Sequence, residues 1–112
     1  MTARDTGLRA EAVAADFLLQ KGCQILARNW RTRWCEIDIV AERAAVAYFC
    51  EVKYRLRSSQ GDGLDYITPK KVRQMQFAAG LWVAAQHWRG EYQLCAIEVT
   101  GPDFRVTAAL KL

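Results

Sequence analysis

The chain has 112 residues, of which 16 are Lys or Arg and 12 are Asp or Glu, so its formal charge is +4 at pH 7. This length predicts one domain over residues 1–112, because a second core would be too small to be stable. With 52% hydrophobic residues, the composition excludes a disordered chain. The longest uncharged apolar stretch is residues 77–85, whereas a bilayer span needs about 20 residues. We therefore expect a cytoplasmic protein with no membrane segment.

The first predicted element is a helix over residues 8–21, with Thr6 as its N-cap and Gly22 just after its end. Its apolar residues recur at spacings of three and four, as in a helix that lies on a core.

Three extended segments follow this helix, and two more lie near the end of the chain. They cover residues 24–30, 34–41, 46–54, 92–99 and 104–107. In the third segment, residues 46–50 are apolar at five successive positions. Such continuous apolarity predicts a strand that is buried on both faces in the middle of a sheet.

Residues 55–66 carry glycine and show no hydrophobic period, which predicts a mobile loop. A second helix is then expected, with Thr68 as N-cap, Pro69 in the first position and an end before Gly90. The order α-β-β-β-α-β-β predicts an α/β fold, in which a mixed central β-sheet is flanked by a helix on each face.

The basic residues are concentrated in one part of the chain. Between Lys53 and Arg73 there are six basic and two acidic residues, so this segment alone accounts for the net charge of +4. Such a patch is typical of a protein that binds phosphate-bearing partners, and it is equally compatible with a solvated loop and helix face. The candidate nucleic-acid-binding residues are Arg55, Arg57, Lys70, Lys71 and Arg73.

The cysteines are not spaced as in a C-x-x-C zinc or redox site. Free core thiols are the prediction for Cys23, Cys35, Cys50 and Cys95, with structural zinc or a disulfide as the alternatives. The single histidine, His87, is expected at the surface or at a helix cap.

Two strands carry ionisable residues at a spacing of two. Glu36 and Asp38 share one strand face, and Glu51 and Lys53 share a face of the next strand. A hairpin with a tight turn at residues 44–45 places position 38 opposite 51 and position 36 opposite 53. That register predicts that the carboxylates of Asp38 and Glu51 meet, with Lys53 next along and Glu36 in a supporting position.

Two buried carboxylates side by side are unfavourable, because each loses hydration and they repel each other. A divalent cation resolves this conflict, since Mg²⁺ prefers carboxylate oxygens and keeps waters for chemistry. Lys53 is then placed to stabilise charge on a phosphate or to activate a water. The alternative for Glu51 and Lys53 is a buried ion pair, but the neighbouring E-x-D string and the basic patch favour a catalytic site.

The spacing Asp38-x12-Glu51-x-Lys53 resembles the signature of the PD-(D/E)xK nuclease superfamily, which has a restriction-endonuclease-like fold. The wider pattern is similar to that of the YraN-like family (UPF0102 type), small bacterial proteins similar to archaeal Holliday-junction resolvases. The resemblance covers nearly the whole chain, and its most specific part is the string from Arg28 to Lys71. The matching strings are Gly7-x-x-Ala10-Glu11, Gly22, Ile25-Leu26-Ala27-Arg28-Asn29, Glu36-Ile37-Asp38, Glu51-Val52-Lys53-x-Arg55 and Ile67-Thr68-Pro69-Lys70-Lys71.

The resemblance implies that Asp38 and Glu51 are ligands of Mg²⁺ or Mn²⁺ and that Lys53 is the catalytic lysine. Glu11 matches an acid of the first helix that reaches the metal site in related resolvases, although an ordinary solvated glutamate fits its position as well. The implied activity is that of a metal-dependent endonuclease acting on DNA, with branched or damaged DNA as candidate substrates.

The chain departs from the family pattern at two places. Cys35 stands where family members usually have Gly, and residues 94–96 lack a late-strand Asp. The second departure implies a weakened second-metal site or a changed network behind the lysine.

Two other functions remain open at this point, a nucleic-acid-binding module that does not cleave and a dimeric structural or adaptor protein. A homodimer would let so small a nuclease engage both strands. The candidates for a dimer surface are Trp30, Trp34, Trp82 and Trp88, for which core packing is the commoner role.

Overall fold

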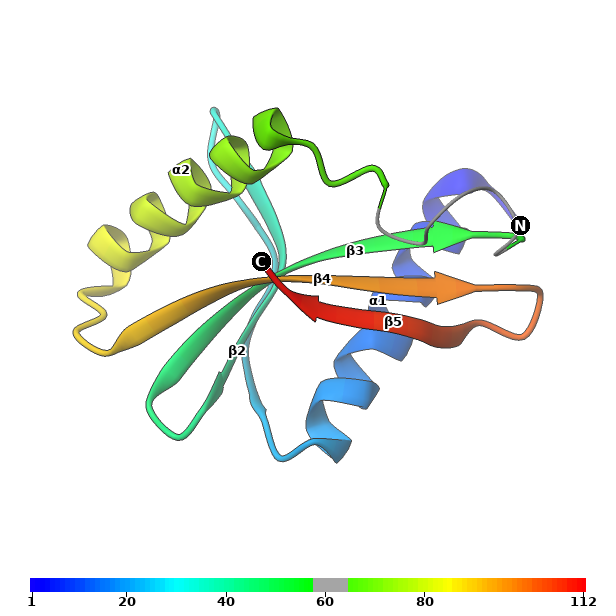
Figure 1. The fold of residues 1–112 in the computed structure, drawn as a ribbon, viewed down its shortest axis with the longest axis horizontal. Coiled ribbons are helices and arrows are strands. Elements are labelled where there is room, and N and C mark those ends of the chain that lie inside the picture. The colour runs from blue at the N-terminus through cyan, green and yellow to red at the C-terminus, as the bar shows by residue number, and fades with distance from the viewer. Residues whose placement is uncertain (58–64) are drawn as a thin grey trace.

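The computed structural model describes residues 1–57 and 65–112, and its elements follow the predicted order. The part of the predicted loop from 58 to 64 lies outside the described residues. The elements are α1 (Ala3–Gln20), β1 (Gln24–Arg31), β2 (Glu36–Arg43), β3 (Val46–Arg55), α2 (Pro69–Gln86), β4 (Glu91–Thr100) and β5 (Arg105–Lys111) (Figure 1).

The five strands form one mixed sheet in the order β1-β2-β3-β4-β5. Strands β3 and β4 are parallel and are connected through α2, whereas the other neighbouring strands are antiparallel. The central position of β3 confirms the prediction from the continuous apolar run at 46–50. The fold class is therefore α/β, as predicted.

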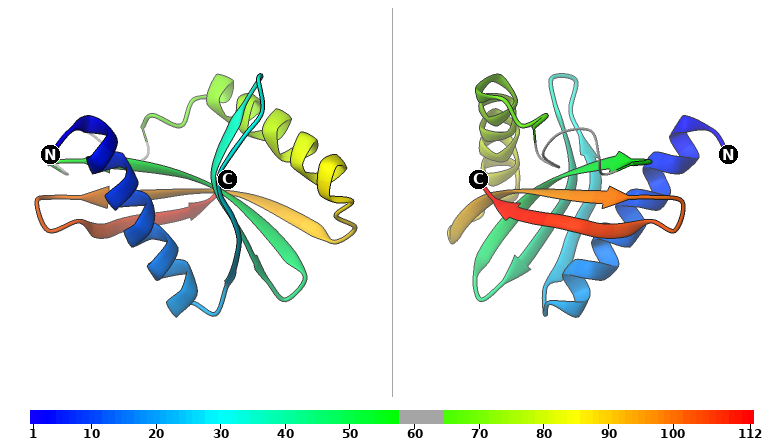
Figure 2. Two further views of the ribbon diagram at one scale, coloured as in Figure 1. Left: turned by 180° about the vertical axis from the view of Figure 1, so that it is seen from behind. Right: turned by 45° about the vertical axis from the view of Figure 1, so that its right-hand side comes forward.

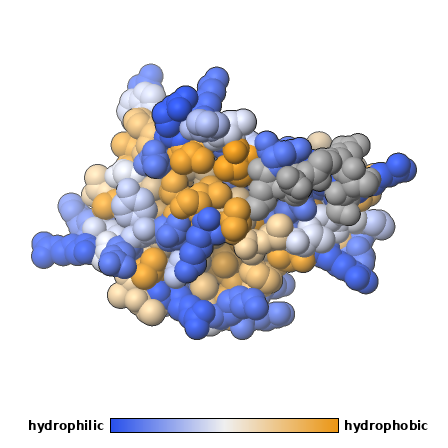
Figure 3. Space-filling model, viewed as in Figure 1, coloured by the Kyte–Doolittle hydropathy of each residue, from blue (hydrophilic) through white to orange (hydrophobic). Residues whose placement is uncertain are grey.

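One helix covers each face of the sheet, as Figure 2 shows from behind and from the side. On one face, α1 packs with its small residues Ala10 and Ala14, which are at most 1% exposed and let the helix lie close to the strands. On the other face, α2 packs through Met75, Ala79 and Trp82. On the side that carries α2, Figure 3 shows hydrophobic residues gathered near the centre of the surface, with hydrophilic residues around them.

The N-terminus of α1 differs from the prediction. The N-cap is Thr2 and not Thr6, so the helix begins at Ala3. The reason is a capping box, in which Asp5 N–H donates to Thr2 Oγ1 and Thr2 N–H donates to Asp5 Oδ2, each at 3.1 Å. The hydroxyl of Thr6 instead donates to the backbone carbonyl of Thr2.

The other helix ends agree with the sequence. Gly22 has φ +88° and His87 has φ 53°, the left-handed values with which helices commonly end. Thr68 caps α2 by accepting a hydrogen bond from Lys71 N–H at 3.1 Å, and Pro69 follows as the first helical residue.

Most of the tryptophans pack in or around the core, as the commoner role of this residue predicts. Trp82 is 4% exposed, and Trp30 and Trp88 pack around the same cluster, but Trp34 in the turn between β1 and β2 is 69% exposed. The four cysteines are free thiols.

Neither described helix is long and apolar enough to cross a membrane.

Candidate functional site

A tight turn sets the register of the hairpin that β2 and β3 form. Arg43 pairs with Val46, and the two residues between them, Ala44 and Ala45, have φ values of 52° and 64°. Two central residues with positive φ are typical of a type I′ turn. The register is the predicted one from Arg43 and Val46 to Ile39 and Cys50, and the pairing ends one residue short of Asp38 and Glu51.

The sheet opens into a fork where the acidic residues lie. Pairing between β2 and β3 ends at Ile39 and Cys50, although β2 stays paired with β1 and β3 with β4 beyond this point (Figure 1). At the fork, Asp38 Oδ2 accepts a hydrogen bond from Val52 N–H at 2.8 Å. The carboxylate thus satisfies an amide that would otherwise face the gap between the strands.

The fork also separates two residues that the hairpin was predicted to pair. Because the strands part after Ile39, the predicted pairing of Glu36 with Lys53 is wrong. The side chain of Glu36 is 62% exposed and forms an ion pair with Arg31 on β1, with Nε and Oε2 3.2 Å apart. The strand neighbour of Lys53 is Glu98 on β4.

The carboxyl group of Asp38 is held in an unfavourable environment for a negative charge. Burial and then the charge of Glu51 raise its pKa to about 7, against the opposing effect of the Val52 N–H. Glu11 and Glu36 raise this pKa further. Burial and the neighbouring acids therefore disfavour a negative charge on Asp38, and a cation bound at this point would favour it.

Glu11 reaches this fork from the opposite layer of the molecule. It lies on α1 and is partly buried, and its Oε1 atom is buried with no hydrogen-bond partner in the described part of the chain. Its charge acts on Asp38. The structure thus brings the predicted helix-one acid near the strand carboxylates, although Asp38, Glu51 and Glu11 do not form a three-ligand cage. Among residues 1–57 and 65–112, no three His, Cys, Asp or Glu side chains are arranged to hold a metal ion.

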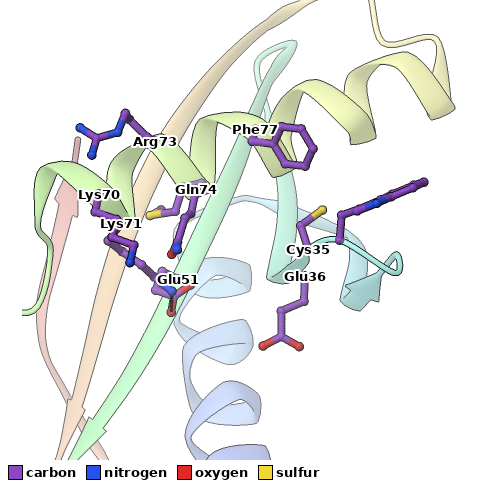
Figure 4. A pocket seen from close by; sticks show the side chains of 10 residues that line it. Cys35, Glu36, Glu51, Lys70, Lys71, Arg73, Gln74 and Phe77 are labelled. Atoms are coloured by element: carbon purple, nitrogen blue, oxygen red, sulfur yellow. Dashed lines mark ion pairs between the residues drawn. The ribbon is translucent and has the colours of Figure 1, made fainter.

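Glu51 has a partner that the sequence did not predict. Lys71 Nζ lies 2.9 Å from Glu51 Oε1, and the two side chains are 33% and 23% exposed. Lys71 is on the first turn of α2, and Figure 4 shows it next to Glu51. This lysine was predicted to contact phosphate, but it belongs to the acidic site itself.

Lys53 is exposed and lies beside an aromatic ring. Its Nζ atom is 5.8 Å from the ring centroid of Tyr66, a residue that the sequence did not single out. The Tyr66 hydroxyl is buried and has no hydrogen-bond partner within residues 1–57 and 65–112. Burial, followed by the charges of Glu51 and Glu98, raises the pKa of this hydroxyl, so it stays protonated and available as a donor.

A buried network lies behind Lys53 and involves a second missed residue, Glu98. Glu98 is 2% exposed, and its Oε1 atom accepts a hydrogen bond from Thr107 Oγ1 at 2.9 Å. Its Oε2 atom is 3.4 Å from Arg55 Nε. Arg55 also pairs with Asp65 and lies under the Tyr66 ring, so its guanidinium faces inward. Glu98 could have been found from the sequence, because it is a charged residue inside the apolar run at 94–99, just as Glu51 is a charged residue inside an apolar strand.

The remaining predicted cations, Arg57, Lys70 and Arg73, have exposed side chains. Lys70 and Arg73 border a surface groove of about 650 Å³ between α2 and the β1–β2 turn. Figure 4 shows the groove with α2 along one wall and Cys35 and Glu36 on the other. Its lining consists of Trp34, Cys35, Glu36, Glu51, Lys70, Lys71, Arg73, Gln74, Met75 and Phe77.

The similarity of the chain to known proteins agrees with the predicted family. Residues 10–101 match the family described as "Uncharacterised protein family UPF0102". A UPF0102 protein of Mycolicibacterium smegmatis is 41% identical over 92 residues, which are 79% of this chain and 74% of that protein. A UPF0102 protein of Mycobacterium tuberculosis is 42% identical over 91 residues, 80% of this chain and 71% of that one. The matches extend over most of both chains and include the fork, and the chain therefore belongs to the UPF0102 family.

Proposed function

We propose that this protein is a metal-dependent endonuclease that hydrolyses phosphodiester bonds in DNA, with branched or damaged DNA as candidate substrates. The observation that carries the proposal is the pair of carboxylates at the fork, Asp38 and Glu51, with Lys53 next along β3. The resemblance of this constellation to the PD-(D/E)xK signature supports the same reaction.

The residues at the fork fit Mg²⁺ or Mn²⁺. Their donors are carboxylate oxygens, and burial, followed by the charge of Glu51, raises the pKa of Asp38 and so disfavours its charged form in the absence of a cation. The Oε1 atom of Glu11 is buried with no hydrogen-bond partner among the described residues, and the charge of Glu11 acts on Asp38, so this carboxylate is a further candidate acceptor. Mg²⁺ in phosphoryl-transfer sites is commonly held by one or two carboxylates together with substrate oxygens, so a three-carboxylate cage is not required.

In this proposal Asp38 and Glu51 hold the metal ion, which when bound neutralises phosphate charge and lowers the pKa of a water. The ammonium group of Lys53 stabilises negative charge that develops on the phosphate oxygens. The ring of Tyr66 flanks the Lys53 ammonium group, with its centroid 5.8 Å from Lys53 Nζ, and so helps to orient this group. The ion pair of Glu98 and Arg55 lies behind Lys53 and supports its part of the site.

A second candidate is a nucleic-acid-binding protein of the same fold that does not cleave. The ion pair between Lys71 and Glu51 favours it, because an ammonium group already neutralises one of the two carboxylates without any metal. In that case the basic residues of α2 bind phosphate and the fork has only a structural role.

A cleavage assay with Mg²⁺ or Mn²⁺ distinguishes the two candidates. Linear, nicked, flapped and four-way DNA substrates are incubated with the wild type, Asp38→Ala and an Asp16→Ala control, since Asp16 is an exposed acid of α1. Titration of Mn²⁺ by calorimetry on the same proteins reports the site independently of activity.

For the endonuclease we expect cleavage and Mn²⁺ binding by the wild type and the control, and loss of both in Asp38→Ala. DNA binding without cleavage of any substrate, together with equal Mn²⁺ binding by all three proteins, would instead establish the non-cleaving alternative.

A further inference from the structure

The groove beside the fork carries two large aromatic side chains that the proposed chemistry does not use. Trp34 and Phe77 line it, and they are 69% and 53% exposed. Burial of a side chain of this size stabilises a protein by a few kcal/mol, so leaving both in water forgoes that gain. Exposed aromatics that line one concave surface commonly mark a binding site.

The turn that carries Trp34 is held in a defined shape by its own hydrogen bonds. Thr32 Oγ1 accepts from Trp34 N–H at 3.1 Å and from Cys35 N–H at 3.2 Å, and Thr32 N–H donates to the Cys35 carbonyl at 2.9 Å. The guanidinium of Arg33 lies 5.3 Å from the Trp34 ring centroid. The ring is therefore presented to solvent by an ordered turn, which lowers the entropy cost of binding a ligand.

The opposite wall of the groove is a stripe on one face of α2. Lys70, Arg73, Gln74 and Phe77 follow at spacings of three and four, so they lie along one side of the helix (Figure 4). By the rise of a helix, this stripe extends about 10 Å from Lys70 to Phe77. Cations thus lie at the end next to Glu51, and aromatic rings lie at the other end.

Aromatic rings beside cations match the chemistry of an unpaired nucleotide, because a base stacks on a ring while its phosphate contacts the cations. A base inside a duplex has its faces covered by its neighbours and cannot stack in this way. Only a flap, a gap or a flipped-out base offers a free face. An apolar protein segment would use the rings but would leave Lys70 and Arg73 unmatched.

We propose that this groove binds an unpaired nucleotide of DNA by stacking the base against Trp34 and Phe77. The proposal rests on the proposed function for its choice of DNA as the partner, and it narrows the substrate class to duplexes with a single-stranded segment. Because Glu51 and Lys71 line the same groove, an unpaired base held there lies beside the acidic site.

Equilibrium binding in EDTA tests the proposal without any metal or cleavage. The probes are a blunt duplex and the same duplex extended by a single-stranded flap, and Trp34→Ala, Phe77→Ala and Trp34→Tyr are compared with the wild type. Leu110→Ala is the matched control, because Leu110 is 52% exposed but lies on β5 outside the groove. Circular dichroism checks that each variant is folded.

We expect the wild type and Leu110→Ala to prefer the flapped duplex. Trp34→Ala and Phe77→Ala should each weaken flap binding by roughly five- to a hundredfold, the range for loss of one base stack, and leave blunt-duplex affinity nearly unchanged. Trp34→Tyr should retain most of the preference, because it keeps an aromatic face. Quenching of tryptophan emission by the flap should disappear in Trp34→Tyr.

Equal affinity of the wild type for the two probes, or equal losses for both probes in the alanine variants, would overturn the base-binding groove while leaving the nuclease proposal standing. Self-association that Trp34→Ala abolishes, with no effect on DNA binding, would assign the groove to a second copy of the chain. A flap preference without cleavage under any metal would support the groove and remove the nuclease. Absence of DNA binding by the wild type would remove both.

Discussion

Lys71 Nζ lies 2.9 Å from Glu51 Oε1, so a cation of α2 neutralises one of the two carboxylates at the fork. A metal ion bound at Glu51 must displace or accommodate this ammonium group. We therefore expect Lys71→Met to tighten Mn²⁺ binding to the DNA-free protein by roughly two- to fivefold, which corresponds to the loss of a partly exposed ion pair. Calorimetric titration of Mn²⁺ measures this change.

Lys70→Met is the control for this prediction, because it removes the same charge from the neighbouring residue, which has no contact with Glu51 among the ion pairs of the described chain. An equal increase of Mn²⁺ affinity in the two variants would mean that only the net charge of the protein affects metal binding. A weaker Mn²⁺ affinity in Lys71→Met would mean that Lys71 organises Glu51 for the metal.

Asp38 predicts a dependence of stability on pH. Its pKa is about 7 in the folded protein, against an ordinary value of 3.8. Between these pH values the folded state keeps a proton that the unfolded state has lost, so the free energy of unfolding falls as the pH rises. Asp38→Asn should therefore be more stable than the wild type at pH 8, by roughly 1–3 kcal/mol, and nearly equal to it at pH 4.

Urea unfolding in EDTA at both pH values measures this difference, with Asp16→Asn as a control for an exposed acid of α1. A stability difference between wild type and Asp38→Asn that is the same at pH 4 and pH 8 would contradict the raised pKa.

Lys53 is expected to act in the chemical step and not in binding. Lys53→Ala should lower the cleavage rate by roughly 100-fold or more, the usual scale for an electrostatic or acid–base catalyst, while Mn²⁺ and DNA affinities stay near those of the wild type. Lys21→Ala, at the C-cap of α1, is the control for the loss of an exposed lysine. An unchanged cleavage rate in Lys53→Ala would show that Lys53 does not act in the chemical step.

Lys70 and Arg73 are exposed near the N-terminus of α2, where a positive charge opposes the helix dipole. Binding of phosphate explains their position, because the positive end of the helix dipole and nearby cations attract an anion. Neutralising both residues should weaken DNA binding and flatten its salt dependence, by about one unit of slope for each phosphate that the variant no longer binds. Arg89→Gln, an exposed cation beyond the other end of α2, should leave the slope unchanged.

Glu98 should contribute to stability through its buried contacts. Glu98→Ala leaves Arg55 without one carboxylate partner and removes one acceptor of the Thr107 hydroxyl, so we expect a loss of about 3–5 kcal/mol in the free energy of unfolding. Glu98→Gln should cost less, since its amide oxygen can still accept from Thr107. Urea unfolding at neutral pH compares the two variants, and equal losses would show that the charge and not the hydrogen bond dominates.

The sequence by itself determined the elements and the central acidic residues. Apolar periodicity predicted two helices and five strands, and continuous apolarity at 46–50 predicted the central strand, because burial on two faces requires apolar residues at every position. Charges inside apolar strands singled out Asp38, Glu51 and Lys53 because burying them is costly. The N-cap of α1 is Thr2 and not the predicted Thr6, because Thr2 and Asp5 form a capping box one turn earlier.

Only the tertiary structure decided which side chains surround these residues. Periodicity determines the face on which a side chain lies, but it does not determine where two strands part or how a helix is placed over a sheet. The separation of β2 and β3 after Ile39, the contact of Lys71 with Glu51 and the approach of Glu11 to Asp38 depend on packing between segments that are distant in the chain. The inward orientation of Arg55 has the same origin. The sequence pattern predicts Arg55 as a phosphate-binding residue, but the buried carboxylate of Glu98 on the adjacent strand attracts its guanidinium group.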